Sequence, residues 1–236
     1  MKKEILIVKN VTHEGPGILE NVLQEKGVAY EVVDLDQGQQ FPSVENYGAV
    51  IILGGPDSAN DENDKMRNEL SRIKEVITGE VPYLGICLGL QTLVKAAGGR
   101  VTKSPLREIG FIDPEGENFT VELTDDGKQD PLFKNLNHTL KVFHLHGETV
   151  ELTGSMVLLG KGKFCKNQIV RVGKNAYGIQ CHFELTTEMF EHWLAIDPDL
   201  QQLDQGQLIF QYEKIKSDYR NVGEQLLKNF LTIAGY

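Results

Sequence analysis

The segment at residues 81–92, VPYLGICLGLQT, constrains the fold of this chain more than any other. It begins as a short apolar run, passes through Gly-x-Cys-x-Gly and continues into apolar residues at helical spacing. A strand that turns sharply into a helix needs glycines on both sides of the residue at the turn, whose backbone is strained and whose side chain is exposed. The segment therefore predicts a strand, a tight turn at Cys87 and a helix.

The chemistry of Cys87 depends on that turn. The same geometry with serine defines the nucleophile elbow of α/β hydrolases. The positive N-terminal end of the helix favours a thiolate, the form of cysteine that attacks carbonyl carbon. A packed cysteine in a tight turn would give the same local pattern, so other segments must decide between the two interpretations.

Composition argues against several classes of function. The 236 residues suffice for one large domain or two small ones. The net charge of −10 does not favour binding to nucleic acid or to an anionic membrane, because both are negatively charged. No apolar run approaches the roughly 20 residues that span a bilayer, and the short run after Met1 lacks the features of a signal peptide. Three cysteines without a CxxC pair fit a reducing compartment. We expect a cytoplasmic protein without a nucleic-acid or membrane partner.

Strand-like and helical segments alternate along the first hundred residues. Residues 48–53 are apolar on both faces, as in a central parallel strand. The alternation predicts a flavodoxin-like, doubly wound α/β fold, with a mainly parallel sheet and helices on both faces. The expected strands are residues 4–9, 30–35 and 48–53, then the strand and helix within 81–98, and the other expected helices are residues 18–26 and 66–78.

The pattern changes after Gly99. Short strand-like runs between Gly, Asp and Asn clusters indicate antiparallel or mixed strands at the sheet edge and a small antiparallel subsidiary sheet. These runs are residues 119–123, 140–144, 156–159 and 168–172, followed by a strand at 176–181 and helices at 186–196 and 203–231. Without a repeat or linker, we expect one domain over residues 1–236. Its helical C-terminal extension, about residues 199–236, is expected to pack on the sheet rather than form an interface.

Two further segments offer groups that a cysteine nucleophile needs. Gly54-Gly55-Pro56 follows a buried strand, where ligand sites form in open α/β sheets, and its amides can approach a substrate oxygen. The amide of Leu88, directly after Cys87, is the second donor that such an oxyanion hole needs. His182 and Glu184 follow a strand and share a side, so the carboxylate can fix the imidazole while its other nitrogen faces a thiol. Each segment alone is more often structural, but the combination points to nucleophilic catalysis.

These segments resemble the signature blocks of the class I (triad) glutamine amidotransferases. The blocks are Gly54-Gly55-Pro56, Leu84-Gly85-Ile86-Cys87-Leu88-Gly89-Leu90-Gln91 and Gly178-Ile179-Gln180-Cys181-His182-Phe183-Glu184. Two more segments are similar to the branch related to the amidotransferase domain of GMP synthetase: Glu108-Ile109-Gly110-Phe111 and His144-Leu145-His146-Gly147-Glu148. The resemblance covers about residues 48–190, in the family's order and spacing.

The resemblance implies a role for each site residue. The thiolate of Cys87 would attack the side-chain carboxamide of glutamine, and His182, oriented by Glu184, would protonate the leaving ammonia. His182 would then activate the water that hydrolyses the γ-glutamyl thioester. No metal or organic cofactor is expected. The groups expected around the oxyanion and the substrate are the amides of Gly55 and Leu88 and the residues Gly54, Gln91 and His146.

Three positions depart from the family pattern. An aromatic residue usually precedes the catalytic histidine and a proline follows it, whereas this chain has Cys181 and Phe183. Neither position has a catalytic role, and we expect Cys181 to make the site more sensitive to oxidation. The segment that usually reads His-Gly-Asp ends here in Glu148, one methylene longer, which leaves the contacts of that loop open.

Metal binding is a rival interpretation for His144 and His146, which share a face of a strand-like run. No third ligand is evident nearby in the sequence, so we expect a packed or hydrogen-bonded pair with His146 at the wall of the site. The acidic run 57–64 is expected to be a solvated loop, or else a lid beside the glycine turn. Trp193 is expected in the core. The remaining histidines, His13, His138 and His192, are expected at the surface or in helix packing.

The destination of the ammonia stays open at this stage. The sequence contains neither an ATP-pyrophosphatase loop nor a Walker loop. We therefore expect ammonia to pass to a separate synthetase subunit. A stand-alone γ-glutamyl peptidase or hydrolase is the alternative. A non-catalytic regulatory module on the same fold ranks lower, because the three catalytic residue types are all present.

Overall fold

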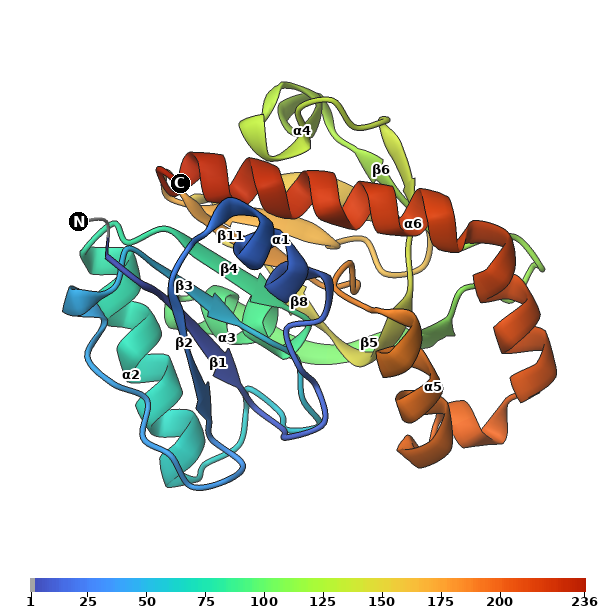
Figure 1. Cartoon of the computed structure of the whole chain (residues 1–236), viewed down its shortest axis with the longest axis horizontal. Coiled ribbons are helices and arrows are strands. Elements are labelled where there is room, and N and C mark those ends of the chain that lie inside the picture. The colour runs from blue at the N-terminus through green and yellow to red at the C-terminus, as the bar shows by residue number, and fades with distance from the viewer. Residues whose placement is uncertain (1–2) are drawn as a thin grey trace.

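A computed structural model describes residues 3–236 (Figure 1). Met1 and Lys2, which belong to the predicted N-terminal segment and domain, lie outside the described residues. The strands are β1 (Ile5–Lys9), β2 (Tyr30–Asp34), β3 (Ala49–Ile52), β4 (Tyr83–Ile86), β5 (Arg100–Gly110), β6 (Thr120–Leu123), β7 (Thr139–Lys141), β8 (His144–Glu151), β9 (Met156–Gly162), β10 (Ile169–Val172) and β11 (Ala176–Ile179). The α-helices are α1 (Ile18–Lys26), α2 (Asp64–Thr78), α3 (Leu88–Ala96), α4 (Asp125–Gln129), α5 (Thr187–Ile196) and α6 (Gln205–Ile233).

The main sheet has nine strands in the order β2-β1-β3-β4-β11-β10-β9-β6-β7. Its first five strands pair in parallel, and the strands from β10 onward pair antiparallel. The strands β5 and β8 form a separate antiparallel ribbon. The predicted α/β class, with a parallel core, mixed strands at the edge and a small subsidiary sheet, is therefore confirmed.

Helices cover both faces of the parallel core. Ile5 and Ile7 of β1 belong to the apolar cluster under α1 and α6, whereas Leu6 and Val8 belong to the cluster under α2 and α3. This alternation follows from the period of two along a strand. A third cluster joins α5 to the N-terminal half of α6, which lies at the right-hand edge in Figure 1, while the C-terminal half of α6 crosses the molecule. The predicted C-terminal helix thus packs within its own chain, while the extent of the domain, residues 1–236, stays a prediction.

The ribbon of β5 and β8 is where the sequence prediction was wrong. A single strand at 140–144 was expected, but the chain forms β7, then a break, then β8, which continues to Glu151. No strand was expected at β5. That strand pairs with β8 alone, carries charged residues and has a register shift between Lys103 and Glu108, so it lacks the apolar pattern of a core strand.

Across residues 3–236, no helix combines the length and apolar character that crossing a membrane requires.

Candidate active site

The turn at Cys87 has the predicted strand–turn–helix geometry. The strand β4 ends at Ile86, α3 begins at Leu88, and Cys87 between them has φ 51° and ψ −103°. A Cβ on Gly89 would lie 2.4 Å from the carbonyl oxygen of Ile52. A Cβ on Gly85 would lie 2.2 Å from the carbonyl oxygen of Gly89. The two glycines are therefore required by close backbone approach. The side chain was expected to be exposed, but Cys87 is only 6% exposed.

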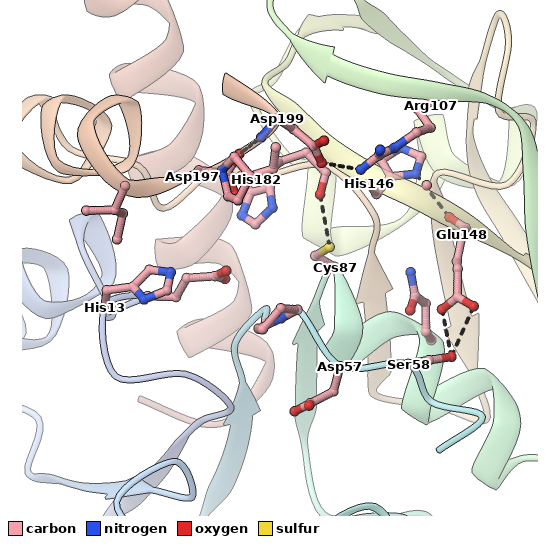
Figure 2. A pocket seen from close by; sticks show the side chains of 18 residues that line it. His13, Asp57, Ser58, Cys87, Arg107, His146, Glu148, His182, Asp197 and Asp199 are labelled. Atoms are coloured by element: carbon pink, nitrogen blue, oxygen red, sulfur yellow. Dashed lines mark hydrogen bonds and ion pairs between the residues drawn. The ribbon is translucent and has the colours of Figure 1, made fainter. Parts of the chain in front are cut away.

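Cys87 lies at a cavity of about 430 Å³ at the carboxyl edge of the parallel strands. Four residues that the sequence singled out line it with Cys87, namely Gly55, Gln91, His146 and His182. Figure 2 shows His13 and Asp197 on one side of Cys87 and Ser58 and Glu148 on the other. Three predicted site residues, Gly54, Leu88 and Glu184, lie just behind the cavity wall.

His182 is held by contacts on several sides. Its Nδ1 lies 2.7 Å from Oε1 of Glu184, whose Oε2 accepts the amide of Phe183 at 2.9 Å. The backbone amide of His182 donates to Phe143, and its carbonyl accepts the hydroxyl of Tyr219 at 2.7 Å. The ring of Trp193, buried as predicted, meets the imidazole nearly perpendicularly, with centroids 5.2 Å apart. The imidazole is thus fixed with Nε2 as its free nitrogen.

The charge of His182 is favoured in spite of its burial. Burial opposes the imidazolium, but the carboxylate of Glu184 and the thiol of Cys87 outweigh it, so the pKa of His182 lies well above its usual value. A histidine that is charged beside a cysteine is the pairing that activates a thiol nucleophile.

The amides of Gly55 and Leu88, which were expected as oxyanion donors, have no acceptor within residues 3–236. The amide of Leu88 is in the first turn of α3, where helix amides lack internal partners. A Cβ on Gly55 would lie 2.7 Å from Cβ of Asn10, so only glycine brings the backbone this close.

Two glutamine side chains extend the site from Cys87 toward α3. The amide nitrogen of Gln180 lies 3.5 Å from Sγ of Cys87, and the amide nitrogen of Gln91 lies 3.4 Å from Oε1 of Gln180. Both glutamines are buried. Gln91 was expected near the substrate, whereas Gln180 was not singled out. Its spacing of two from His182 on the same extended segment is the signal that was available.

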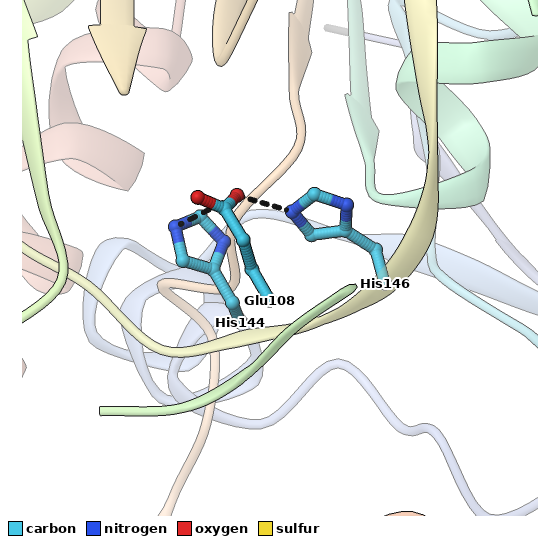
Figure 3. A group of neighbouring side chains, drawn as sticks. All are labelled: Glu108, His144 and His146. Carbon is cyan, nitrogen blue, oxygen red and sulfur yellow. Dashed lines mark hydrogen bonds and ion pairs between the residues drawn. The ribbon is translucent and has the colours of Figure 1, made fainter. Parts of the chain in front are cut away.

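A second buried network lies behind His146 (Figure 3). Oε2 of Glu108 lies 2.8 Å from Nε2 of His146 and 3.7 Å from Nε2 of His144, and it also accepts the amide of Gln168 at 2.8 Å. Nδ1 of His146 faces the carbonyl oxygen of Glu148 at 3.0 Å. Both nitrogens of His146 are therefore used within the protein, so this structure offers the substrate its ring and backbone only.

Glu108 supplies the third potential metal ligand that the sequence did not reveal. The ligand atoms of Glu108, His144 and His146 all lie within 4.8 Å of one another. Tetrahedral zinc, with bonds of about 2.0–2.1 Å, holds its ligand atoms about 3.3 Å apart. The distance of 2.8 Å between Nε2 of His146 and Oε2 of Glu108 is shorter than this and is that of a hydrogen bond. The two histidines, expected as a packed or hydrogen-bonded pair, pack edge to face with ring centroids 5.0 Å apart, and the hydrogen bond of His146 goes to Glu108. Burial beside His146 and His182 holds the pKa of His144 well below its usual value.

The polar rim of the cavity is tied together. Oε1 and Oε2 of Glu148 both lie 3.0 Å from Oγ of Ser58, so the longer side chain links its loop to the acidic segment. Asp57 pairs with Lys65 at 2.6 Å, and Arg107 pairs with Asp199. The start of the acidic run 57–64 is thus bound to its neighbours rather than only solvated.

Three residues in or near the cavity differ from expectation. Cys181 is fully buried in the core, and burial raises the pKa of its thiol well above the usual range, so the predicted sensitivity to oxidation has no support. Glu14, in the loop after β1, lines the cavity and was missed entirely. The one sequence feature that could have indicated Glu14 is its position in the loop after a strand, at the carboxyl edge of the sheet. His13, expected at the surface or in helix packing, meets the ring of His192 and also lines the cavity.

An open α/β sheet with a cysteine at a strand-to-helix turn beside a buried histidine–glutamate pair defines the class of fold and site. The family model described as glutamine amidotransferase class-I matches residues 17–196. The chain therefore belongs to the class I glutamine amidotransferase family, as the sequence resemblance implied.

Similar proteins agree with this assignment. The chain is 32% identical over 155 residues to the glutamine amidotransferase-like protein YfeJ of Salmonella typhimurium, covering 64% of this chain and 62% of that protein. It is 32% identical over 170 residues to the GMP synthase of Thermosipho melanesiensis, covering 71% of this chain but 30% of that enzyme. The crystal structure of a glutamine amidotransferase from Thermotoga maritima has a TM-score of 0.86 at 26% identity, covering 98% of each chain.

Proposed function

We propose that this protein hydrolyses the side-chain amide of glutamine through a γ-glutamyl thioester on Cys87. The observation that carries the proposal is the arrangement of Cys87, at a strained turn with free oxyanion amides, beside His182 and Glu184. Class I family membership supports the same reaction.

Each step uses a group of the described site. The thiolate of Cys87 attacks the amide carbon, forming the S–C bond and moving the carbonyl electron pair onto oxygen, which the amides of Gly55 and Leu88 stabilise. The C–N bond breaks, nitrogen keeps the electron pair, and His182 gives it a proton. His182 then removes a proton from water, whose oxygen bonds to the thioester carbon. The C–S bond breaks, sulfur keeps the electron pair and regains a proton from His182, and glutamate is released.

The ammonia is proposed to pass to a separate synthetase. The match to this chain covers 30% of the length of the Thermosipho GMP synthase, and the rest of that enzyme lies outside the match. A stand-alone γ-glutamyl hydrolase is the second candidate. The cavity continues past Cys87 toward His13 and Asp197, which leaves room for a leaving group larger than ammonia (Figure 2). A non-catalytic module ranks below both, and the cytoplasmic location stays a prediction.

Mass spectrometry of the intact protein tests the proposal. The protein is incubated with glutamine, with γ-glutamyl peptides and with a glutamine-analogue electrophile, and Cys87→Ala is the control. We expect a γ-glutamyl adduct on Cys87 that is absent from the variant. If no compound modifies Cys87, the proposed function is wrong. Glutaminase activity that rises on addition of a synthetase favours the first candidate, and full turnover of γ-glutamyl peptides without a partner favours the second.

A further inference from the structure

Glu14 is a buried carboxylate in the catalytic cavity to which no role has been given. It follows β1, is 9% exposed and lines the cavity with Cys87 and His182. Among the described residues, its Oε2 has no hydrogen-bond partner. A buried carboxylate oxygen without a donor is costly, so its retention in a cavity points to a donor that arrives with the substrate.

The position of Glu14 relates it to the reacting groups. A Cβ built on Gly54 would lie 2.4 Å from Oε2 of Glu14, 3.3 Å from Cε1 of His182 and 3.4 Å from Cβ of Cys87. The missing side chain of Gly54 is therefore what lets the carboxylate come close to both catalytic residues. Gln91, which the family resemblance places near the glutamine substrate, lines the same cavity and lies against Gln180, whose amide nitrogen contacts Sγ of Cys87.

Charge decides which substrate atom Glu14 can meet. In the tetrahedral intermediate, the oxyanion faces the amides of Gly55 and Leu88, and a carboxylate would repel it. The leaving nitrogen faces His182, and it still carries N–H groups that His182 does not need. These N–H groups are the donors that a carboxylate beside His182 can accept.

We propose that Glu14 accepts a hydrogen bond from the leaving nitrogen of the scissile amide and so selects amides over esters at this site. The proposal rests on the proposed function. Glu14 takes no proton in the step. Nitrogen keeps the electron pair of the broken C–N bond and takes its third proton from His182, while one of the two N–H groups it already carries donates to Glu14.

The ionisation of Glu14 agrees with this role. Burial raises the pKa of Glu14 to about 7, with Glu184 and Asp197 adding to the rise and His182 opposing it. The carboxylate therefore forms near neutral pH. Because only the ionised form is a full acceptor, the preference for amides should increase as the pH rises through about 7.

The test compares glutamine with the γ-methyl ester of glutamate, which lacks the N–H donors. The rate of Cys87 acylation is measured for the wild type and for Glu14→Gln. We expect acylation by glutamine to fall about 10- to 100-fold in the variant, and acylation by the ester to change less than about threefold. The matched control is Glu69→Gln, which removes another buried carboxylate outside the cavity and should leave the amide-to-ester ratio unchanged.

The pH dependence of the wild type gives a second measurement that needs no variant. The amide-to-ester ratio should rise between pH 6 and pH 8, following the ionisation of Glu14 near 7. Equal loss of both reactions in Glu14→Gln, or no loss, overturns the inference, as does a ratio that is flat with pH. Failure of the proposed function looks different, because then neither substrate acylates Cys87 in the wild type.

Discussion

His182 illustrates how single residues make this site work. Its imidazole has one nitrogen bound to Glu184 and one left for the thiol, and Trp193 and Tyr219 hold the ring and the backbone. Fixed geometry of this kind is what allows a proton to be moved at the right moment of the reaction.

Replacing Glu184 by glutamine should disable the pair without removing its hydrogen bond. The carboxylate is the main group that raises the pKa of His182 against the effect of burial, so the pKa should fall in Glu184→Gln. We expect Cys87 acylation by glutamine to slow by roughly 10²- to 10⁴-fold. Histidine NMR titration measures the pKa, and an unchanged value for His182 would contradict the electrostatic account.

The structure brings the predicted site residues together, whereas the sequence did not indicate much of what surrounds them. Cys87 and the glycine turn at residues 54–56 are marked by local backbone requirements, which short motifs record. Glu14 and Glu108 act through contacts with residues far away in the chain, and no local pattern marks such contacts. The exposure of Cys87 was misjudged for the same reason, because the walls of the cavity come from distant segments.

At the scale of elements, α6 holds the segment that carries His182. Tyr219 donates to the carbonyl of His182, and Gly223 lies against the carbonyl of Phe183. The helix α1, which packs beside α6 on the same face of the sheet, adds to this, since the amide of Ile18 donates to the carbonyl of Glu184 at 2.8 Å. The two helices thus position a segment that belongs to no strand or helix.

A methyl group at Gly223 should push α6 away from that segment. The Cβ of Gly223→Ala would lie 2.3 Å from the carbonyl oxygen of Phe183, so backbone must move. We expect a loss of about 1–3 kcal/mol in the free energy of unfolding, although alanine has the higher helix propensity, together with slower acylation of Cys87.

Urea unfolding and the acylation assay measure the two effects of Gly223→Ala. Gly154→Ala is the control, because no atom lies within 4 Å of its new Cβ, and its stability should match the wild type. A Gly223→Ala variant as stable and as active as this control would refute the positioning role of α6.

The sequence predicted core elements well and edge elements poorly. The inner strands β1, β3, β4 and β11 of the parallel core are buried on both faces, so their apolar runs are strong local signals. The strands β5 and β8 pair only with each other, and their register depends on that partner rather than on a buried face. The pairing of β5 with β8, which brings Glu108 next to His146, could therefore not be predicted from the sequence.

At the scale of the whole molecule, buried carboxylates should make stability depend on pH. Glu69 is fully buried in α2, and burial raises its pKa from 4.5 to about 7. The folded protein therefore binds a proton that the unfolded chain releases. The protonated Glu69 side chain therefore contributes its full stabilisation of the folded state below pH 4.5, and this contribution is lost as the pH rises through about 7.

Glu69→Gln should remove this part of the pH dependence. Between pH 5 and pH 8, the wild type should lose about 2 kcal/mol more free energy of unfolding than the variant. Urea unfolding at several pH values measures the difference. Parallel curves for the two proteins would show that Glu69 does not titrate with folding. Glu14 contributes in the same direction, which Glu14→Gln measures separately.

The positive φ of Cys87 lowers the stability of the folded protein at the position that the proposed reaction uses. A left-handed backbone is unfavourable for every residue with a β-carbon, by about 1 kcal/mol or more, and suits only glycine. Cys87 therefore occupies a position from which folding alone would remove it. Screening variants for heat resistance would favour its loss, and the proposed function gives the reason for a cysteine at this turn.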